Sequence, residues 1–257
     1  MKFPARDRVL YDPNPLIQVV CNVSFPRILA IDHELPVGFQ QDLIEAFPFL
    51  ETQEAPIVTG ATERAEEKAP RSTIYEFYSS DRNVTIALGA DFVGIRVLEY
   101  ERWEKFRDHI RLAVSTLLKH YSPKVFTRLS LNYVNSVERS KLGLEGVPWR
   151  ELIAPELIGP FAREDIPEAE VESYASVINF PIAEGTVRIA VGTATPDEPE
   201  EKQRFLIDNL FLSAKAIDAD EQQSLDRLSA FNAESGCVFQ WCIRPRLHDA
   251  LNPRPVS

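Results

Sequence analysis

The sequence predicts an α+β protein with a mainly antiparallel, curved sheet and helices on one face of that sheet. Three observations predict this class. Short β-rich runs alternate with tight turns, and two long stretches carry apolar residues at the spacing of an amphipathic helix. The 257-residue chain is also 44% hydrophobic and 26% charged. That composition is typical of globular domains and excludes a disordered, collagen-like or disulfide-scaffold chain.

Residues 1–122 predict a strand, a helix, three strands and a second helix. Leu16–Phe25 is rich in β-branched residues and follows an Asn-Pro turn signal, and Val37–Phe47 has apolar residues at helical spacing. The polar stretch Glu51–Ser72 predicts a long loop. An antiparallel meander is expected next, with strands at Thr73–Ser79, Val84–Leu88 and Phe92–Glu99. From Trp103 a clearly amphipathic helix runs until Pro123 stops it.

Residues 123–257 predict the same order of elements. Phe126–Val137 alternates as a strand, and Pro148–Leu157 predicts a short helix with proline in its first turn. Three strands are expected at Val171–Phe180, Thr186–Thr193 and Arg204–Ser213. The acidic tract Pro196–Gln203 predicts a hairpin tip, and Asp220 with Gln223 forms a capping box that starts the last long helix. The two halves, 1–122 and 123–257, therefore predict an internal repeat of element order within one compact body.

The bulk composition favours a cytoplasmic protein. No stretch approaches the roughly 18–20 apolar residues that a membrane span needs, and the charged N-terminus lacks the apolar core of a secretory signal. The three cysteines, Cys21, Cys237 and Cys242, lie among apolar residues, which predicts reduced, packed thiols rather than metal ligands. With 28 basic and 39 acidic residues the net charge is −11, which disfavours indiscriminate binding to nucleic acid.

Three segments carry a resemblance to a known family. They are the opening Asn14–Phe25 with its Asn-Pro turn and strand, the aromatic-led helix from Trp103, and the late Val238-Phe239 stretch. Together these segments resemble a sporadically distributed prokaryotic family of uncharacterised proteins of about this length. The resemblance covers nearly the whole chain and implies a bacterial or archaeal protein linked to mobile elements or defence genes. It implies no reaction and no catalytic residue.

One face of the second half is the candidate binding surface. Arg128 and Asn132 lie on the same side of their predicted strand, and Arg188 and Arg204 lie on other strands of that half. If that side is open, its arginines and amides could bind a peptide strand, a nucleotide or single-stranded nucleic acid. The alternative interpretation is a solvated sheet face without a ligand.

The sequence contains few signs of catalysis. Phosphate-binding glycine loops, the GxSxG elbow and the HExxH zinc motif are all absent, so no cofactor or metal is expected. Asp208 is flanked by Asn209 and followed by Lys215, and this arrangement partly resembles the carboxylate sites of metal-dependent nucleases. The alternative is a polar residue on the exposed face of the sheet.

Three functional hypotheses follow, in order of preference. The first is a non-enzymatic module that docks a protein partner or associates with itself, with a homodimer expected. The second is a nucleic-acid or nucleotide binder that uses Arg128, Arg188 and Arg204. The third is a metal-dependent hydrolase or nuclease built around Asp208.

Overall fold

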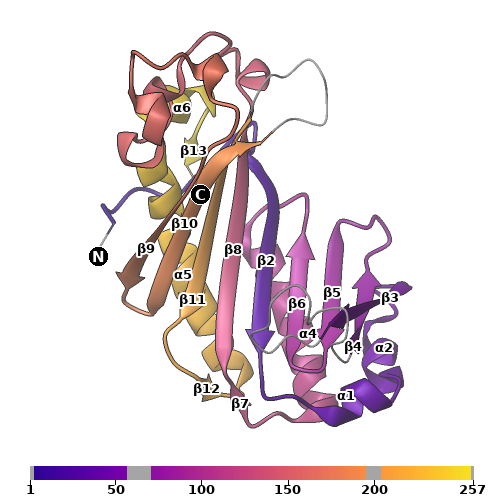
Figure 1. Ribbon diagram of the computed structural model, residues 1–257. Coiled ribbons are helices and arrows are strands. Elements are labelled where there is room, and N and C mark those ends of the chain that lie inside the picture. Colours follow the sequence, from indigo (N-terminus) through magenta and orange to yellow (C-terminus); the bar gives the residue numbers. More distant parts are fainter. Residues whose placement is uncertain (1–2, 57–70, 195–203, 256–257) are drawn as a thin grey trace. The chain divides into compact units, whose positions relative to one another are not determined.

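The computed structural model describes residues 3–56, 71–194 and 204–255 (Figure 1). The protein is α+β, as its sequence predicts, and it is dominated by a nine-stranded antiparallel sheet. In spatial order this sheet consists of β3 (Phe49–Pro56), β4 (Arg71–Tyr78), β5 (Val84–Gly89), β6 (Phe92–Val97), β2 (Leu16–Ser24), β8 (Arg128–Val137), β11 (Arg204–Ser213), β10 (Gly185–Ala194) and β9 (Ala175–Ile182). Its two edges are therefore β3 and β9.

Short strand pairs and helices complete the chain. The pairs are β1 (Val9–Leu10) with β13 (Arg254–Pro255) and β7 (Val125–Phe126) with β12 (Ile217–Asp218). The helices are α1 (Leu29–His33), α2 (Val37–Leu43), α4 (Trp103–Tyr121), α5 (Glu221–Cys242) and α6 (Pro245–Ala250). Short 3-10 turns lie between β8 and β9, at Ser140–Leu142, Trp149–Glu151, Pro155–Leu157, Gly159–Ala162 and Glu168–Glu170. None of the helices in the described ranges has the length and apolarity that a membrane span requires.

The chain folds into two compact units. Unit 1 comprises Met1–Val19, Leu131–Leu212 and Ser229–Ser257, and unit 2 comprises Val20–Ser130 and Ser213–Leu228. The units do not coincide with the expected halves 1–122 and 123–257, because β2, β8 and α5 each contribute residues to both. Element-order patterns along a chain cannot reveal such interleaving.

In unit 2 the long helix α4 packs against β6 and α2 (Figure 1). Its apolar stripe is the one that the sequence predicts, and Phe106, Ile110 and Leu117 are buried. The helix ends at Ser122, which adopts the left-handed conformation and donates its backbone N–H to the carbonyl oxygen of Leu118. Strands β5 and β6 present Ile86 and other apolar residues to the same core.

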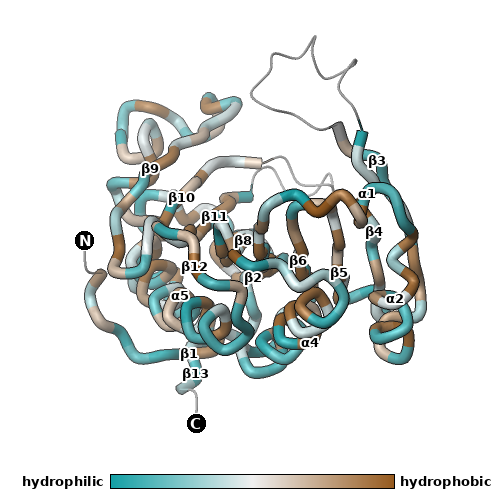
Figure 2. The backbone as a smooth tube through the Cα atoms, turned by 90° about the horizontal axis from the view of Figure 1, so that it is seen from below, coloured by the Kyte–Doolittle hydropathy of each residue, from teal (hydrophilic) through white to brown (hydrophobic). Residues whose placement is uncertain are grey.

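In unit 1 the C-terminal part of α5 covers one face of the strands (Figures 1 and 2). Phe231 of this helix is fully buried, and its ring centroid lies 5.8 Å from that of Phe211 on β11. The alternation along β11 buries Phe205, Ile207 and Phe211, whereas Asp208 and its even-numbered neighbours are only half-buried. The second face of these strands is therefore partly open to solvent.

Three predictions about individual elements are wrong. The expected loop Glu51–Ser72 begins within the edge strand β3 and ends in the first two residues of β4, and residues 57–70 between them lie outside the described residues. A polar edge strand buries little apolar area, so backbone pairing with β4 forms it without a hydrophobic pattern. The expected helix Pro148–Leu157 is two 3-10 turns, and the expected strand Val171–Phe180 is β9, shifted to Ala175–Ile182.

The order of elements in the two halves differs by one strand. In the first half, four strands rather than the expected three lie between α2 and α4, namely β3 to β6. In the second half, three strands of the nine-stranded sheet lie between the 3-10 turns and α5, namely β9 to β11. The internal duplication thus stays a prediction. The expected hairpin tip Pro196–Gln203 lies outside the described residues.

Candidate functional site

A row of polar side chains crosses the open face of unit 1. Asp208 on β11 is hydrogen-bonded by Asn132 of β8 and faces the charge of Arg188 on β10. Burial raises the pKa of the Asp208 carboxyl above its ordinary value, and Arg188 and Asn132 only partly offset this effect. The side-chain Oδ1 atoms of Asp208 and Asn132 are both buried without a hydrogen-bond partner. The residues of the row therefore interact with one another, but two of their hydrogen-bond acceptors remain unused.

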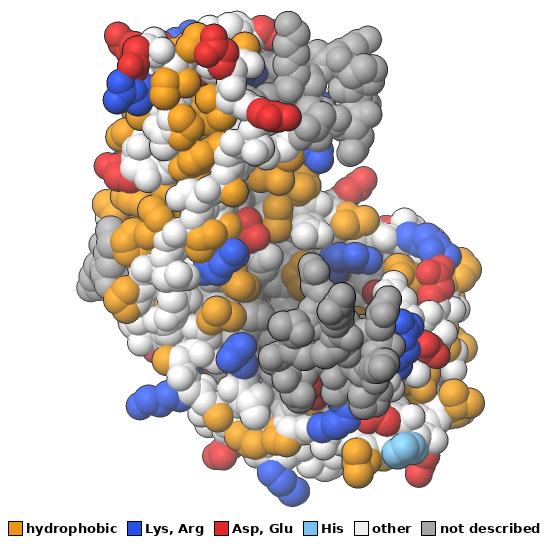
Figure 3. Space-filling model, in the orientation of Figure 1, with side chains coloured by type: hydrophobic (Ala, Val, Ile, Leu, Met, Phe, Trp, Pro, Cys, Tyr) orange, Lys and Arg blue, Asp and Glu red, His pale blue; other side chains and the backbone are white. Residues whose placement is uncertain are grey.

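The row continues onto the edge strand. Arg188 lies directly opposite Asn179 in the antiparallel pairing of β10 with β9, and Ala190 lies opposite Val177. Burial alternates strictly along β9, whose exposed positions are Ala175, Val177, Asn179 and Pro181. Val177 is 48% exposed, which is a large fraction for a β-branched apolar side chain. Figure 3 shows hydrophobic side chains gathered along this side of the face.

The backbone of β9 also presents hydrogen-bonding groups outward. The N–H of Thr193 donates to the carbonyl oxygen of Tyr174 at 2.9 Å, in register with the pairing of β9 and β10. Hydrogen-bonded pairs alternate in an antiparallel ladder, so the even-numbered residues of β9 point their N–H and C=O groups toward β10. The odd-numbered residues point outward, among them Val177 and Asn179. Pro181 belongs to this outward set, which is where an edge strand tolerates a missing N–H.

Aromatic contacts hold β9 in place at both ends. Before the strand, the Tyr174 hydroxyl donates to the carbonyl oxygen of Leu157 at 3.0 Å, and its ring lies edge-on to Phe161. Near the end of the strand, Phe180 packs edge-on against both Phe3 and Trp241, with ring centroids 5.6 and 5.7 Å away. The exposed edge is therefore part of a packed layer and is presented with a defined geometry.

A glycine makes room for the first of these contacts. Gly159 has φ +47°, and a Cβ atom at this position would lie 2.5 Å from the ring of Tyr174. A side chain there would require both a left-handed backbone and displacement of the ring. Gly159 thus fixes the point at which the chain enters β9.

The structure brings together only part of the predicted arginine face. Asn132, Arg188 and Asp208 are neighbours, as described above. Arg204 is the first residue of β11 and lies four residues from Asp208, which corresponds to roughly 13 Å along a strand. Arg128 is exposed at the start of β8 and belongs to unit 2. Since Asp208 also offsets the charge of Arg188, the arginines do not form one continuous basic surface within unit 1.

Sequence reasoning missed Val177 and Asn179, which the structure places at the accessible edge. A signal was available, because Ala175–Ile182 contains no charged residue in a chain that is 26% charged. No further metal-ligating side chains join Asp208 in the described part of the chain. Among the described residues, no three His, Cys, Asp or Glu side chains gather in a way that could hold a metal ion.

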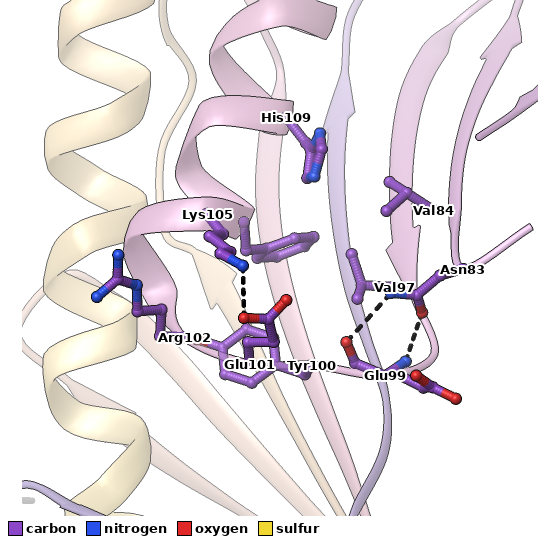
Figure 4. Close-up of a pocket in the computed structure, with 10 residues that line it drawn as sticks. Asn83, Val84, Val97, Glu99, Tyr100, Glu101, Arg102, Lys105 and His109 are labelled. Carbon is purple, nitrogen blue, oxygen red and sulfur yellow. Dashed lines mark hydrogen bonds and ion pairs between the residues drawn. The ribbon is translucent and has the colours of Figure 1, made fainter. Parts of the chain in front are cut away.

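A separate hollow lies in unit 2 beside the start of α4 (Figure 4). Its polar groups already bond to one another. Asn83 exchanges two hydrogen bonds with the backbone of Glu99, at 2.6 and 3.3 Å, and Lys105 pairs with Glu101 at 2.5 Å. His109 on its wall packs edge-on against Phe47, and burial lowers the pKa of its imidazole despite the opposing charges of nearby aspartates. A neutral, packed histidine and paired charges are typical of a structural surface.

Comparison with known proteins adds no assignment. No family model matches this chain, and no curated protein matches its sequence.

Proposed function

We propose that this protein is a protein-binding module that accepts an extended polypeptide segment along the outer edge of β9. The observation that carries the proposal is the chemistry of this edge. β9 is an eight-residue, uncharged strand whose outward residues are exposed, and among the described residues no further strand pairs with it. Such an edge can add a strand through backbone hydrogen bonds, while alternate side chains supply specificity.

The opposite edge of the sheet shows what a protected edge looks like. β3 carries Glu51 and Glu54, which form ion pairs with Arg82 at 2.8 Å and with Arg71 at 3.4 Å. Charged side chains on an edge strand discourage pairing with other chains. β9 lacks this protection, and this difference supports a binding role for β9 rather than for β3.

The face next to β9 supports the same role. An added strand would place every second side chain beside Val177 and Asn179, next to the row formed by Arg188 and Asp208. Apolar and polar side chains then alternate along the exposed edge of β9. This arrangement suits a peptide segment whose own side chains alternate between apolar and polar. The module would act by docking rather than by catalysis.

Site-specific photo-cross-linking in cells tests the proposal. A photoreactive amino acid is placed at Val177 and, as a matched control, at Asp226, which is exposed on α5. We expect position 177 to give adducts that map to one defined peptide segment, and we expect Asn179→Pro to abolish them by removing an outward N–H. If position 177 gives no more adducts than position 226, the proposal is wrong.

A further inference from the structure

We infer that Phe180 and Trp241 form a binding site for an aromatic side chain of an incoming basic peptide, and that Phe3 of the same chain occupies this site until the peptide displaces it. The site adjoins the edge of β9, so the inference rests on the proposed function and adds the type of residue that anchors the bound segment. Three features support it: the geometry of the rings, the place of the site at the edge of the sheet, and the way the residues after Phe3 are attached.

Three aromatic rings meet near the end of β9. The ring of Phe3 stands edge-on to those of Phe180 and Trp241, with centroids 5.6 and 5.5 Å away and interplanar angles of 88° and 73°. The centroids of Phe180 and Trp241 are themselves 5.7 Å apart. Such contacts are attractive because the positive edge of one ring meets the negative face of the other. All three side chains are only half-buried, so departure of Phe3 would uncover the other two rings for another aromatic side chain.

The site lies where a strand added to β9 would present a side chain. Phe180 points to the helix-covered face, where it meets Trp241 of α5. Among the described residues no strand pairs with the outer side of β9, and Figures 1 and 2 both show the start of the chain on this side of the sheet, beside α5. Side chains opposite each other on paired strands have Cβ atoms about 4.5–5.5 Å apart. An added strand would therefore place a side chain next to Phe180, in the region that Phe3 occupies.

The residues that follow Phe3 are attached like a bound peptide. Phe3–Arg8, here called the arm, forms no helix or strand, and most of its side chains are exposed. The side-chain amide of Gln240 on α5 donates to the carbonyl oxygen of Asp7 at 3.0 Å. The thiol of Cys237 donates to the carbonyl oxygen of the preceding residue at 4.0 Å. Any extended segment offers such carbonyl groups, so the ring of Phe3 is the contact that indicates which side chain the site selects.

Charge indicates that the displacing peptide is basic. Residues 1–8 contain three basic and one acidic residue, in a chain whose net charge is −11. Glu234 lies seven residues before Trp241 on α5 and therefore on the same side of the helix. Burial, and then the charge of Glu184 beyond the end of β9, raise the pKa of the Glu234 carboxyl. Two carboxyl groups that act on each other beside the site favour a segment that brings positive charge.

Tryptophan fluorescence of the full chain tests whether Phe3 covers Trp241. Trp103 and Trp149 are buried, with 6% and 0% of their surface exposed, so changes at the surface are reported by Trp241. Phe3→Ala should shift the emission to longer wavelength and increase its quenching by acrylamide, and the same substitution in a Trp241→Phe chain should do neither. The matched control is Phe49→Ala, at a 45% exposed phenylalanine of β3, which should leave the emission unchanged. If Phe3→Ala also leaves it unchanged, the inference is overturned.

A synthetic peptide of residues 1–8, labelled with fluorescein, tests the site in trans by fluorescence anisotropy. If the arm fills its own site about nine-tenths of the time, the Phe3→Ala chain should bind this peptide about tenfold more tightly than the wild type does. The peptide that itself carries Phe3→Ala should bind about tenfold more weakly or worse, because it loses the anchor and keeps the charges. The Phe49→Ala chain should bind like the wild type. Equal affinities for the two peptides would show attraction by charge alone and overturn the inference.

The photo-cross-linking experiment at Val177 separates this inference from the proposed function. Phe3→Ala should increase the yield of adducts at position 177, because the anchor site is then vacant, whereas Phe49→Ala should not change it. Specific adducts whose yield is the same with and without Phe3→Ala overturn the inference and leave the binding role of the edge intact. Binding of the aromatic peptide without specific adducts at position 177 has the opposite meaning. Phe180 and Trp241 then form an aromatic site, and the addition of a strand to β9 is wrong.

Discussion

Truncation of Phe231 to alanine tests whether α5 seals one face of the unit 1 strands and leaves the other open. Phe231 is completely buried and packs on Phe211, with 5.8 Å between ring centroids and an interplanar angle of 32°. Loss of a fully buried phenylalanine side chain removes its transfer free energy and leaves a cavity, which together cost about 3–5 kcal/mol. For a chain of this size the melting temperature should fall by about 6–20 °C.

The assay is urea unfolding followed by tryptophan fluorescence, with Leu210→Ala as the matched control. Leu210 lies next to Phe211 in sequence but points to the half-buried face. We expect its truncation to cost only about 1 kcal/mol because less apolar area is lost from the core. A double-mutant cycle of Phe231→Ala with Phe211→Ala should show a coupling of about 0.5–1.5 kcal/mol. Equal costs for Leu210→Ala and Phe231→Ala would refute the one-sided packing on which the open face depends.

Three further predictions concern the site and its support. Asp208→Asn should raise the free energy of unfolding at pH 7, because burial raises the pKa of the native carboxyl and so favours its protonated form. The wild type should lose stability relative to this variant as the pH rises above the pKa that the carboxyl has in the unfolded chain. If the difference in melting temperature between the two proteins is the same at pH 4 and at pH 7, this prediction is contradicted. Gly159→Ala should cost clearly more than Gly143→Ala in urea unfolding. Both residues have positive φ, but only at Gly159 would the added Cβ meet a ring, whereas at Gly143 it meets nothing within 4 Å. Asp220→Ala should cost about 1 kcal/mol, since Asp220 caps α5 by accepting the N–H of Gln223 at 2.7 Å, whereas Asp220→Asn should cost little; a cost for Asn equal to that for Ala would show that the cap is unimportant.

Amphipathic and alternating segments were predictable because burial imposes a periodic pattern on the residues involved. The helix from Trp103 and the strand Arg204–Ser213 are found where the sequence predicts them. Asp220 caps α5 by accepting the N–H of Gln223, which is one of the two hydrogen bonds of the predicted capping box. The polar edge strand Phe49–Pro56 was missed because it is formed by backbone pairing, which leaves no hydrophobic period in the sequence.

The candidate site was only partly predictable. Alternation placed Arg128 and Asn132 on one side of their strand, but it could not show that Asn132, Arg188 and Asp208 form one row on a half-buried face. That neighbourhood depends on the spatial order β8, β11, β10, β9, in which strands distant in sequence lie side by side. Arg128 belongs to unit 2, which no local pattern reveals.

The sequence by itself determined the class of this protein, the faces of its long helix and its best strands, and the absence of charge from Ala175–Ile182, because each of these is a local property of side chains and their spacing. Only the tertiary structure decided that Ala175–Ile182 is an edge rather than a central strand. Whether a strand is paired on one side or two depends on hydrogen bonds to residues far away in the chain, and no local pattern encodes them.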